Sequence, residues 1–232
     1  MCETTENKSI SQVIIEKIQD MIIRDKLKIG DKLPPERQLT EMWKVGRPAL
    51  REALKALEVI GLIERKHGQG NFISNNISDS YYKPLSISFK LNNGSIEELF
   101  ELRESLEASS IKAAAKKASI KDIKKLYEIH EGMISEKDES KKTKFDKALH
   151  CEIIKLSGNK LFITTWNSIS YLIDIFIDKA VNISLYEEKS IQNIYEEHLC
   201  IIKAVENHDS KAAVEALEEH LNKINVELLK TT

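Results

Sequence analysis

Apolar and polar residues follow two different patterns along this chain, and the change between them divides it into two parts. In the first part the apolar runs are short and are separated by Gly and Pro, which begin or end regular structure. The expected elements are a helix over 36–43, a turn over 44–46, a helix over 47–60 stopped by Gly61, and strands over 62–66 and 71–73. The longer helix would face inward with Leu50, Leu54, Leu57 and either Val59 or Ile60.

The second part, from about residue 95 onward, has apolar residues at helical spacing almost throughout and lacks strand signals. Ser95, with Glu98 three residues on, forms a capping box that begins the first of these helices. The expected helices cover residues 96–118, 122–137, 143–157, 160–181, 190–207 and 210–230. Because short connections make neighbouring helices antiparallel, this part is predicted to be an antiparallel all-α helical bundle.

Between the two parts lies a segment rich in Asn and Ser, with Pro84 and the run Asn92-Asn93-Gly94. It lacks a helical period for most of its length, although its aromatic and aliphatic residues indicate that it packs against something. We expect an ordered linker over 77–94, with a short helix and an extended piece, between domains over 1–76 and 95–232. The fold class is therefore mainly α, with one small β-hairpin.

Length, charge and cysteine content narrow the class of protein. The 232 residues suffice for two modest domains. No run of 18 apolar residues occurs and the polar start is not a signal peptide, so we expect a cytoplasmic protein without membrane contact. Three cysteines without CxxC spacing argue against a disulfide framework, and Cys151 and Cys200 are expected in the core. Five of the six arginines lie within the first 65 residues, which favours DNA binding by the first part alone.

Residues 33–74 have the order of elements of a winged helix-turn-helix, in which a hairpin, the wing, follows two helices joined by a short turn. In such units the N-terminal end of the second helix reaches base edges in the major groove. Arg47 and Arg51 lie at that end, beside Pro48, and arginine bonds guanine or phosphate with two donors at once. The alternative is that individual arginines are solvated or pair with nearby acidic residues, namely Glu36, Glu41 and Glu52.

Five short pieces of this part form a recognisable pattern: Leu33-Pro34, Glu36-Arg37, Val45-Gly46-Arg47, Arg51-Glu52-Ala53-Leu54 and Gly68-Gln69-Gly70. They resemble the DNA-binding domain of the GntR family of bacterial transcription regulators. Pro35 and Gly46 stand where the family usually has serine, so hydroxyl caps or phosphate contacts are lost. The resemblance implies a set of residues that face duplex DNA, the last two in the minor groove: Arg37, Arg47, Pro48, Arg51, His67 and Gly68.

Four residues of the bundle form a candidate metal site. Asp146 and His150 are four residues apart on one helix face, while His198 and His220 lie on two further helices, each within a Glu-Glu-His-Leu sequence. Three imidazoles and one carboxylate suit zinc or another borderline first-row ion, with room for a water or an anion. Most Asp/His pairs at this spacing are solvated surface residues, and spacing alone leaves that interpretation open.

Further motifs extend over the whole second part: Glu101-Leu102-Arg103, Leu106-Glu107, Phe145-Asp146, His150, Ser157-Gly158-Asn159, Glu197-His198, His208-Asp209, Ala212 and His220. They resemble the FCD ligand-binding domain of the FadR subfamily within GntR. The resemblance implies that a divalent cation, zinc first and nickel or manganese as alternatives, is held by Asp146, His150, His198 and His220. It also implies that Arg103 faces inward and clamps a carboxylate effector. The alternative for Arg103 is an ion pair with Glu107.

Three functions are compatible with these features. The first is a homodimeric regulator that binds double-stranded operator DNA and responds to a small organic acid bound beside the metal. The second is a DNA-binding regulator whose metal is purely structural. The third is a metal-dependent hydrolase, but no general base is identifiable beyond the glutamates beside His198 and His220. We expect the first function and no enzymatic activity, because an enzyme would not need the DNA-binding part.

Overall fold

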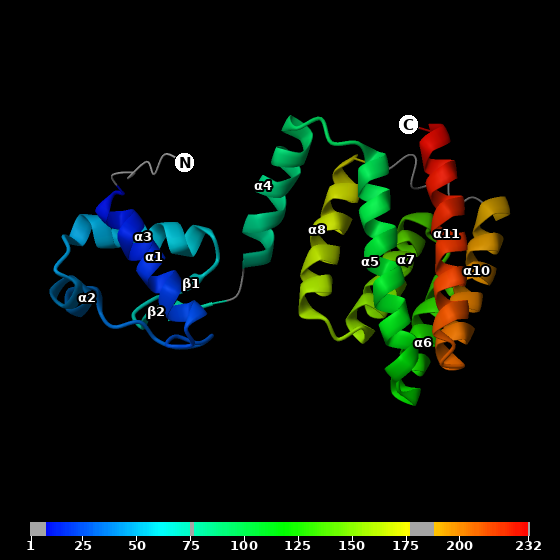
Figure 1. Ribbon diagram of the computed structural model, residues 1–232, viewed down its shortest axis with the longest axis horizontal. Coiled ribbons are helices and arrows are strands. Elements are labelled where there is room, and N and C mark those ends of the chain that lie inside the picture. The colour runs from blue at the N-terminus through cyan, green and yellow to red at the C-terminus, as the bar shows by residue number, and fades with distance from the viewer. Residues whose placement is uncertain (1–7, 75–76, 177–187, 232) are drawn as a thin grey trace, which may run out of the picture. The chain divides into compact units, whose positions relative to one another are not determined.

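The computed structural model describes residues 8–74, 77–176 and 188–231, which form two compact units divided between Leu85 and Ser86 (Figure 1). The division falls inside a helix, α4, so each unit is described by itself. In the part of the chain that the structure describes, no helix is long and apolar enough to cross a membrane.

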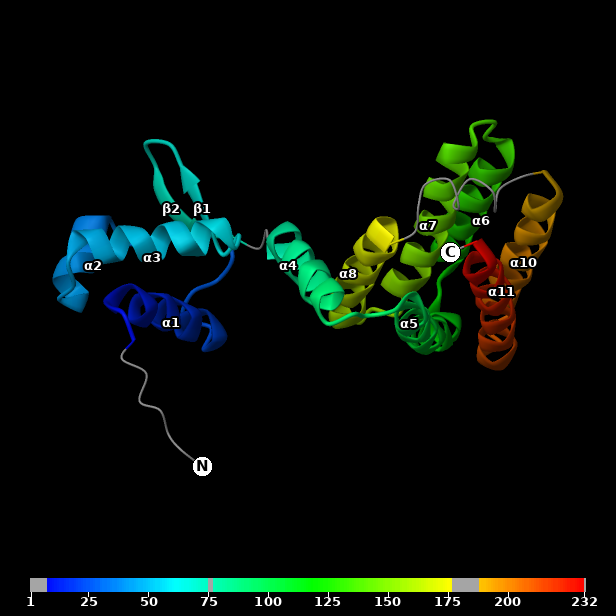
Figure 2. The ribbon, with the colours of Figure 1, turned by 90° about the horizontal axis from the view of Figure 1, so that it is seen from above.

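The N-terminal unit has the predicted helices and hairpin, preceded by one helix that was not predicted. Its elements are α1 (Ile10–Ile23), α2 (Glu36–Trp43), α3 (Arg47–Val59), β1 (Ile63–Lys66) and β2 (Gly70–Ile73). The two strands are antiparallel, with Ile63 opposite Ile73. Figure 2 shows α1 and the hairpin on opposite sides of α3. The winged helix-turn-helix is therefore confirmed, with α3 as its central helix.

The core of this unit is built from all of its elements, α1 included. Ile14 and Ile18, one helical turn apart on α1, pack with Leu50 and Leu57 of α3. The expectation that Val59 or Ile60 faces inward is wrong, because both are exposed. Val59 lies about 200° around the helix from Leu57, and Ile60 caps the end of α3.

The two positions where serine is missing are the caps of α2 and α3. Pro35 is the N-cap of α2 and Gly46 the N-cap of α3, and neither supplies a side-chain hydrogen bond. Between the helices the backbone reverses at Lys44, whose φ is 54°. In the wing, Gly68 and Gly70 have φ of 70° and 110°, as a tight turn requires. Helix starts without caps leave backbone N–H groups available to an external acceptor such as phosphate.

The segment expected to be a linker with little helix is helical for most of its length, which corrects the prediction. Helix α4 covers Ile77–Leu91 and includes Pro84. Pro84 removes one backbone donor but leaves the remaining hydrogen bonds of the helix. The helix ends where Asn93 takes a φ of 54° and the ring of Phe89 covers Gly94, leaving no space for a Cβ atom there. Gly94 thus follows the end of a helix that the polar composition of the segment did not predict.

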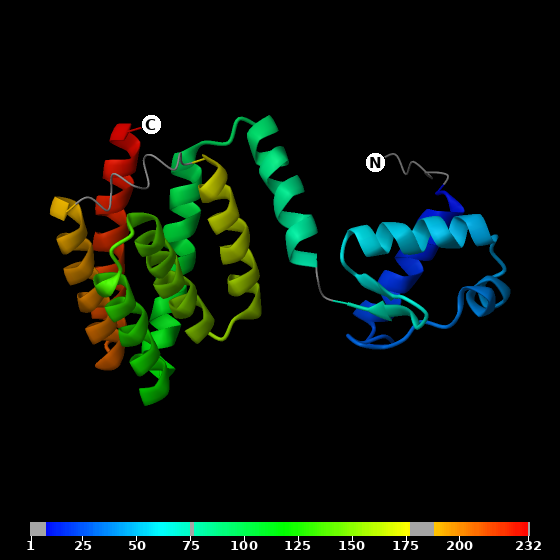
Figure 3. The same ribbon diagram turned by 180° about the vertical axis from the view of Figure 1, so that it is seen from behind.

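The C-terminal unit is a bundle of helices, as Figures 1 and 3 show. After α4, its helices are α5 (Ile96–Lys117), α6 (Ile120–Ser135), α7 (Glu139–Leu156), α8 (Lys160–Phe176), α10 (Glu188–Glu206) and α11 (Ser210–Thr231). Helix α5 packs against α7, α8 and α11, while α10 packs against α6 and α11. The predicted helical bundle is confirmed, and α5 lies at its centre.

Local signals set the ends of these helices. Ser95 and Ser119 each accept a hydrogen bond from the backbone three residues on, and each forms a capping box. Because Ser119 is a cap, α6 begins at Ile120 rather than at residue 122 as predicted. The helix predicted over 160–181 is described as far as Phe176, and its predicted end lies outside the described residues. Of the cysteines, Cys151 packs against the core, whereas Cys200 is exposed, contrary to expectation.

Candidate metal centre and DNA-binding surface

The N-terminal unit exposes every residue that was predicted to face DNA. Arg47, Pro48 and Arg51 lie in the first turns of α3, Arg37 lies on α2, and His67 and Gly68 form the tip of the wing. These are the places from which a winged helix reaches the major groove and the adjacent backbone. The exposure of all six is compatible with DNA contact, and their individual contacts remain predictions.

Two of these arginines are held by glutamates. Arg51 Nε donates to Glu36 Oε2 at 2.9 Å, and Arg37 Nε donates to Glu41 Oε1 at 3.0 Å. The alternative interpretation of paired arginines therefore applies to both in the structure. Such exposed ion pairs contribute only about 0.2–1 kcal/mol, so a DNA phosphate or guanine can replace them.

Two lysines around Phe72 of the wing were not singled out in the sequence. Lys32 and Lys66 place their ammonium groups 5.9 Å and 5.0 Å from the ring centroid of Phe72. Lys32 also pairs with Phe72 through an isolated β-bridge. Their positions result from the hairpin fold, and no spacing in the sequence distinguishes them from other lysines. They add positive charge around Phe72 of the wing.

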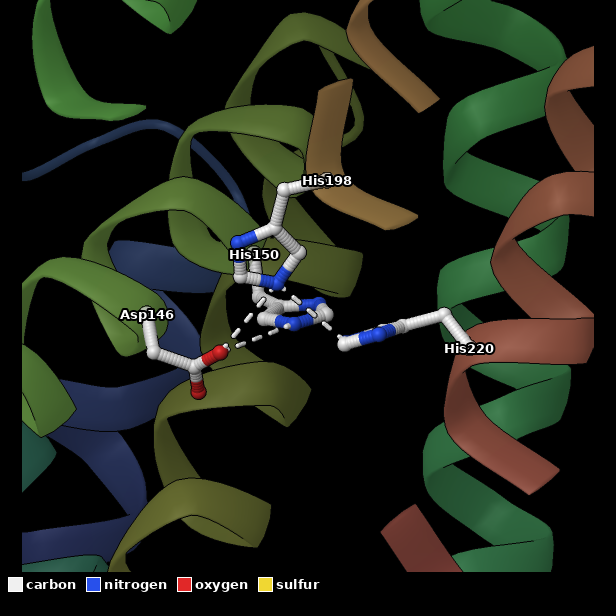
Figure 4. A group of neighbouring side chains, drawn as sticks. All are labelled: Asp146, His150, His198 and His220. Carbon is white, nitrogen blue, oxygen red and sulfur yellow. Dashed lines mark hydrogen bonds and ion pairs between the residues drawn. The ribbon is translucent and has the colours of Figure 1, made fainter. Parts of the chain in front are cut away.

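The bundle brings the four candidate metal ligands together. Asp146 and His150 lie one turn apart on α7, His198 lies on α10 and His220 on α11, and all four side chains are buried. One ligand atom from each lies within 4.8 Å of the others. Figure 4 shows the side chains converging on one point between the three helices. The alternative of solvated surface residues is therefore wrong.

The distances within this group fit a shared cation better than a hydrogen-bond network. His198 Nε2 lies 3.3 Å from Asp146 Oδ1 and 3.3 Å from His220 Nε2, and His150 Nε2 lies 3.8 Å from Asp146 Oδ1. Asp146 Oδ1 and His150 Nε2 are buried and have no hydrogen-bond partner among the described residues. Buried polar atoms are normally satisfied. A divalent ion bound by the four would satisfy both atoms, and the donor set fits that group.

Two glutamates outside the group orient two of its histidines. Glu107 on α5 pairs with His150 Nδ1, and Glu197 on α10 lies 2.8 Å from His220 Nδ1. A carboxylate at Nδ1 places the proton there and leaves Nε2 as the free donor atom, as outer-sphere partners of metal-bound histidines do. Glu197 adjoins His198 in the sequence, which offered a weak signal. Glu107 is 43 residues from His150, so only the packing of α5 on α7 reveals it.

The charges of this centre are coupled, and the pKa values show it. Burial alone would raise the pKa of Glu107, but His150 and Arg103 outweigh it and lower the pKa to about 2. Burial also opposes ionisation of Asp146, yet the neighbouring histidines hold its pKa well below the usual range. Burial lowers the pKa of His220 to about 4, although Glu197 acts in the opposite direction. Near neutral pH the centre therefore presents carboxylate oxygen and a neutral His220 imidazole, the forms that bind metals.

Arg103 lies beside the centre and forms the ion pair that was its alternative interpretation. Its Nε donates to Glu107 Oε1 at 2.7 Å, and its guanidinium carbon lies 5.6 Å from the ring centroid of Trp166. The ring of Trp166 also stacks on His150, with 6.1 Å between centroids. Because Glu107 contacts both Arg103 and His150, the ion pair keeps the arginine next to the metal ligands. Binding of an effector carboxylate by Arg103 remains a prediction.

Comparisons with known proteins agree with this architecture. Residues 10–73 match the family of bacterial regulatory proteins called gntR, and residues 98–223 match the FCD domain. The chain is 32% identical to the HTH-type transcriptional regulator LutR of Bacillus subtilis (strain 168) over 206 residues, 88% of this chain and 94% of that protein. It is 30% identical to the HTH-type transcriptional repressor NanR of Enterobacter sp. (strain 638) over 224 residues, 94% of this chain and 85% of that protein.

Among solved structures, the fold is similar to that described as Streptococcus agalactiae GntR. The TM-score is 0.61 at 23% sequence identity, and the match covers 92% of this chain and 98% of the other. At this level of identity the likeness concerns the fold.

Proposed function

Since the chain belongs to the GntR family and is a DNA-binding transcription regulator with a C-terminal FCD domain, we propose that a metal ion and a small carboxylate bound in its bundle control its affinity for operator DNA. The metal would be held by Asp146, His150, His198 and His220. The carboxylate would contact the metal and Arg103. The regulator would act as a homodimer in the cytoplasm.

The observation that carries the metal proposal is the pair of buried atoms without partners, Asp146 Oδ1 and His150 Nε2, at the point where four ligand atoms converge. Three imidazole nitrogens and one carboxylate oxygen match zinc and other borderline divalent ions. Glu107 and Glu197 support the same interpretation, since they fix the tautomers of two ligands. The ion would supply positive charge next to the buried carboxylate of Asp146.

The proposal of a carboxylate effector follows from the groups around that ion. Four protein ligands leave coordination positions for an anion on ions that accept five or six ligands. Arg103 lies beside the ligands, and its planar guanidinium suits two-point contact with a carboxylate. A negatively charged effector would thus be attracted by both the metal ion and the guanidinium of Arg103. Its binding would draw Arg103 away from Glu107 and change the packing of α5, the central helix of the bundle.

The bundle can affect DNA binding through the two-fold symmetry of the proposed dimer. Helix-turn-helix dimers bind two half-sites about one helical turn apart, about 34–36 Å on B-form DNA, and a two-fold dimer matches a palindromic site. A change in bundle packing that alters the spacing of the two DNA-binding units would change operator affinity. Arg37, Arg47, Pro48, Arg51, His67 and Gly68 are proposed as the DNA contacts.

A purely structural metal is the second candidate function. The burial of all four ligands favours it, since structural ions tie helices together without exchanging their ligands. A hydrolase is not supported, because the relatives and families that match are transcription regulators.

The experiment that separates these candidates is a thermal-shift screen on the full chain. Protein purified without chelator should contain about one divalent ion per chain, and the His198→Ala variant should contain much less. Small mono-, di- and tricarboxylic acids are then added to metal-loaded and to chelated protein. An acid that raises the melting temperature only with metal present supports the regulator. Metal without any response to the panel would favour the structural ion, and no metal would remove the site.

A further inference from the structure

The described residues contain four buried side-chain atoms without a hydrogen-bond partner, and all four lie in one region of the bundle. They are Asp146 Oδ1, His150 Nε2, His198 Nδ1 and His130 Nδ1. The first two face the candidate metal centre, where a bound ion would satisfy them. The other two nitrogens still need partners, and His130 has no role in the site as described so far.

His130 lies on α6 and is packed against His198. Their rings meet edge to face with 6.3 Å between centroids, and only 5% of His130 is exposed. Tyr195, on α10, packs edge-on against His130 at the same separation. Figure 4 shows His198 turning Nε2 toward the other three side chains and Nδ1 away from them. The two nitrogens without partners therefore belong to neighbouring rings in one buried corner.

The chemistry of a metal-bound histidine tells what His198 needs. A histidine that binds an ion through Nε2 carries its proton on Nδ1, and that N–H almost always donates to a second protein group or water. His150 and His220 have Glu107 and Glu197 in this role. Among the described residues, His198 has no such acceptor.

We propose that His130 is the outer-sphere partner of His198, the group that binds the ring nitrogen not used for the metal, and that it positions this ligand. The inference rests on the proposed metal site. With 6.3 Å between the ring centroids, the two ring nitrogens cannot approach to the about 2.9 Å of a direct N–H···N bond. The link that we propose between them is therefore one bridging water. The water accepts from His198 Nδ1–H and donates to His130 Nδ1. His130 then carries its own proton on Nε2.

A pair of substitutions that differ only in where they place a polar atom tests this directly. The side-chain oxygen of His130→Asn lies close to the place of Nδ1, whereas that of His130→Gln lies close to the place of Nε2. His130→Phe keeps a ring and removes both nitrogens. The affinity of the full-length protein for Zn²⁺ alone is measured by competition with a chelating indicator.

Loss of an outer-sphere partner typically weakens metal binding about 10–100-fold. We expect His130→Phe and His130→Gln to bind Zn²⁺ at least about 10-fold more weakly, and His130→Asn to stay close to the unsubstituted protein. Tyr195→Phe is the matched control, because it removes a hydroxyl that contacts Met133 O at 3.4 Å in the same corner. This control should not change Zn²⁺ affinity.

A second readout reports on the hydrogen bond itself. In zinc-loaded protein labelled with ¹⁵N-histidine, the Nδ1–H proton of His198 should exchange slowly with water, and His130→Phe should make it exchange rapidly. A purely structural role of His130 would not affect this one proton while circular dichroism stays unchanged.

The outcomes separate this inference from the proposal on which it rests. If the unsubstituted protein does not bind zinc, the proposed metal site fails and the role of His130 fails with it. If it binds zinc and His130→Phe matches it within twofold, the metal site stands and the positioning role is overturned. Equal affinities of His130→Asn and His130→Gln would also overturn it, since the proposal requires an acceptor at the Nδ1 position.

Discussion

Replacement of Asp146 by asparagine tests the candidate metal centre with the smallest change in shape. Asp146 is the only carboxylate among the four ligand candidates, and its Oδ1 lies 3.3 Å from His198 Nε2 and 3.8 Å from His150 Nε2. An amide fits the same space but carries no charge. We expect the metal-free variant to fold like the parent and to lose most of its affinity for zinc.

The expected size of the zinc-induced shift in melting temperature follows from the linkage between zinc binding and folding. With free zinc at about 100 times its dissociation constant, binding stabilises the folded state by about 2.7 kcal/mol. For a chain of this size that corresponds to a rise in melting temperature of roughly 5–11 °C. Outer-sphere substitutions already weaken metal binding by about 10–100-fold, so loss of a direct anionic ligand should cost at least the upper value. At the same zinc concentration about 0.4 kcal/mol would remain, a rise of roughly 1–2 °C.

The assay is differential scanning calorimetry of chelated protein with and without added zinc. Asp174→Asn is the matched control, because Asp174 lies on α8, is exposed and pairs with Lys147 rather than with the four ligands. The control should keep the full shift. A full zinc shift in Asp146→Asn would refute the assignment of the site, and loss of the shift in both variants would show that it does not report on this centre.

Three further predictions follow from the two sites. Arg47→Ala combined with Arg51→Ala should abolish sequence-specific DNA binding in an electrophoretic mobility assay and leave the melting of the bundle unchanged, since arginine forks read base edges; retained affinity would contradict the DNA-facing assignment. In chelated protein, His220 has a folded pKa of about 4 against an ordinary value of 6.5, so its contribution is complete above pH 6.5 and is lost as pH falls toward 4. The free energy of unfolding in urea should fall by up to about 3 kcal/mol over that range, and His220→Gln should make the dependence of this free energy on pH less steep. An equal dependence on pH in both proteins would refute protonation of His220 as the cause. Arg103→Lys keeps the charge beside Glu107 but loses the planar fork, so thermal shifts caused by carboxylic acids should shrink while zinc binding persists, and an unchanged acid response would exclude Arg103 as a clamp.

The sequence predicted those parts of the fold that depend on local signals. Gly61 ends α3, Ser95 begins α5, and the Gly68-Gln69-Gly70 turn forms the wing, because each residue type favours its backbone conformation wherever it occurs. Helix α1 was missed although Ser9 caps it and Ile14 and Ile18 are one turn apart.

Helix α4 shows where local signals mislead. Pro84 and the polar residues around it favoured a linker, but the helix continues through Pro84 to Leu91. Phe89, half-buried against Gly94, secures its end. The stability of such a segment depends on packing, which no short window of sequence displays.

The candidate metal centre also contains residues that the sequence predicted and residues that only packing brings there. Asp146 and His150 share a helix turn, so their proximity followed from spacing. The repeated Glu-Glu-His-Leu sequence pointed to His198 and His220, and the resemblance implied that all four residues hold one ion. The residues that support them could not be found by spacing, since Glu107 and His130 meet the ligands only after helices α5 and α6 pack into the bundle. Burial also changed their chemistry, because the low pKa of Glu107 arises from Arg103 and His150 together.

The most direct test of the account measures the affinity of the full-length protein for DNA in three states of the bundle. The probe is a fluorescently labelled duplex that the purified protein itself selects from a randomised pool, and the acid is the one giving the largest thermal shift. Fluorescence anisotropy is recorded with chelator, with zinc, and with zinc plus this acid. We predict that the acid changes the dissociation constant by at least about 5-fold, as coupled sites do, and that Asp146→Asn abolishes the change. Identical dissociation constants in all three states would contradict control of DNA binding by the bundle.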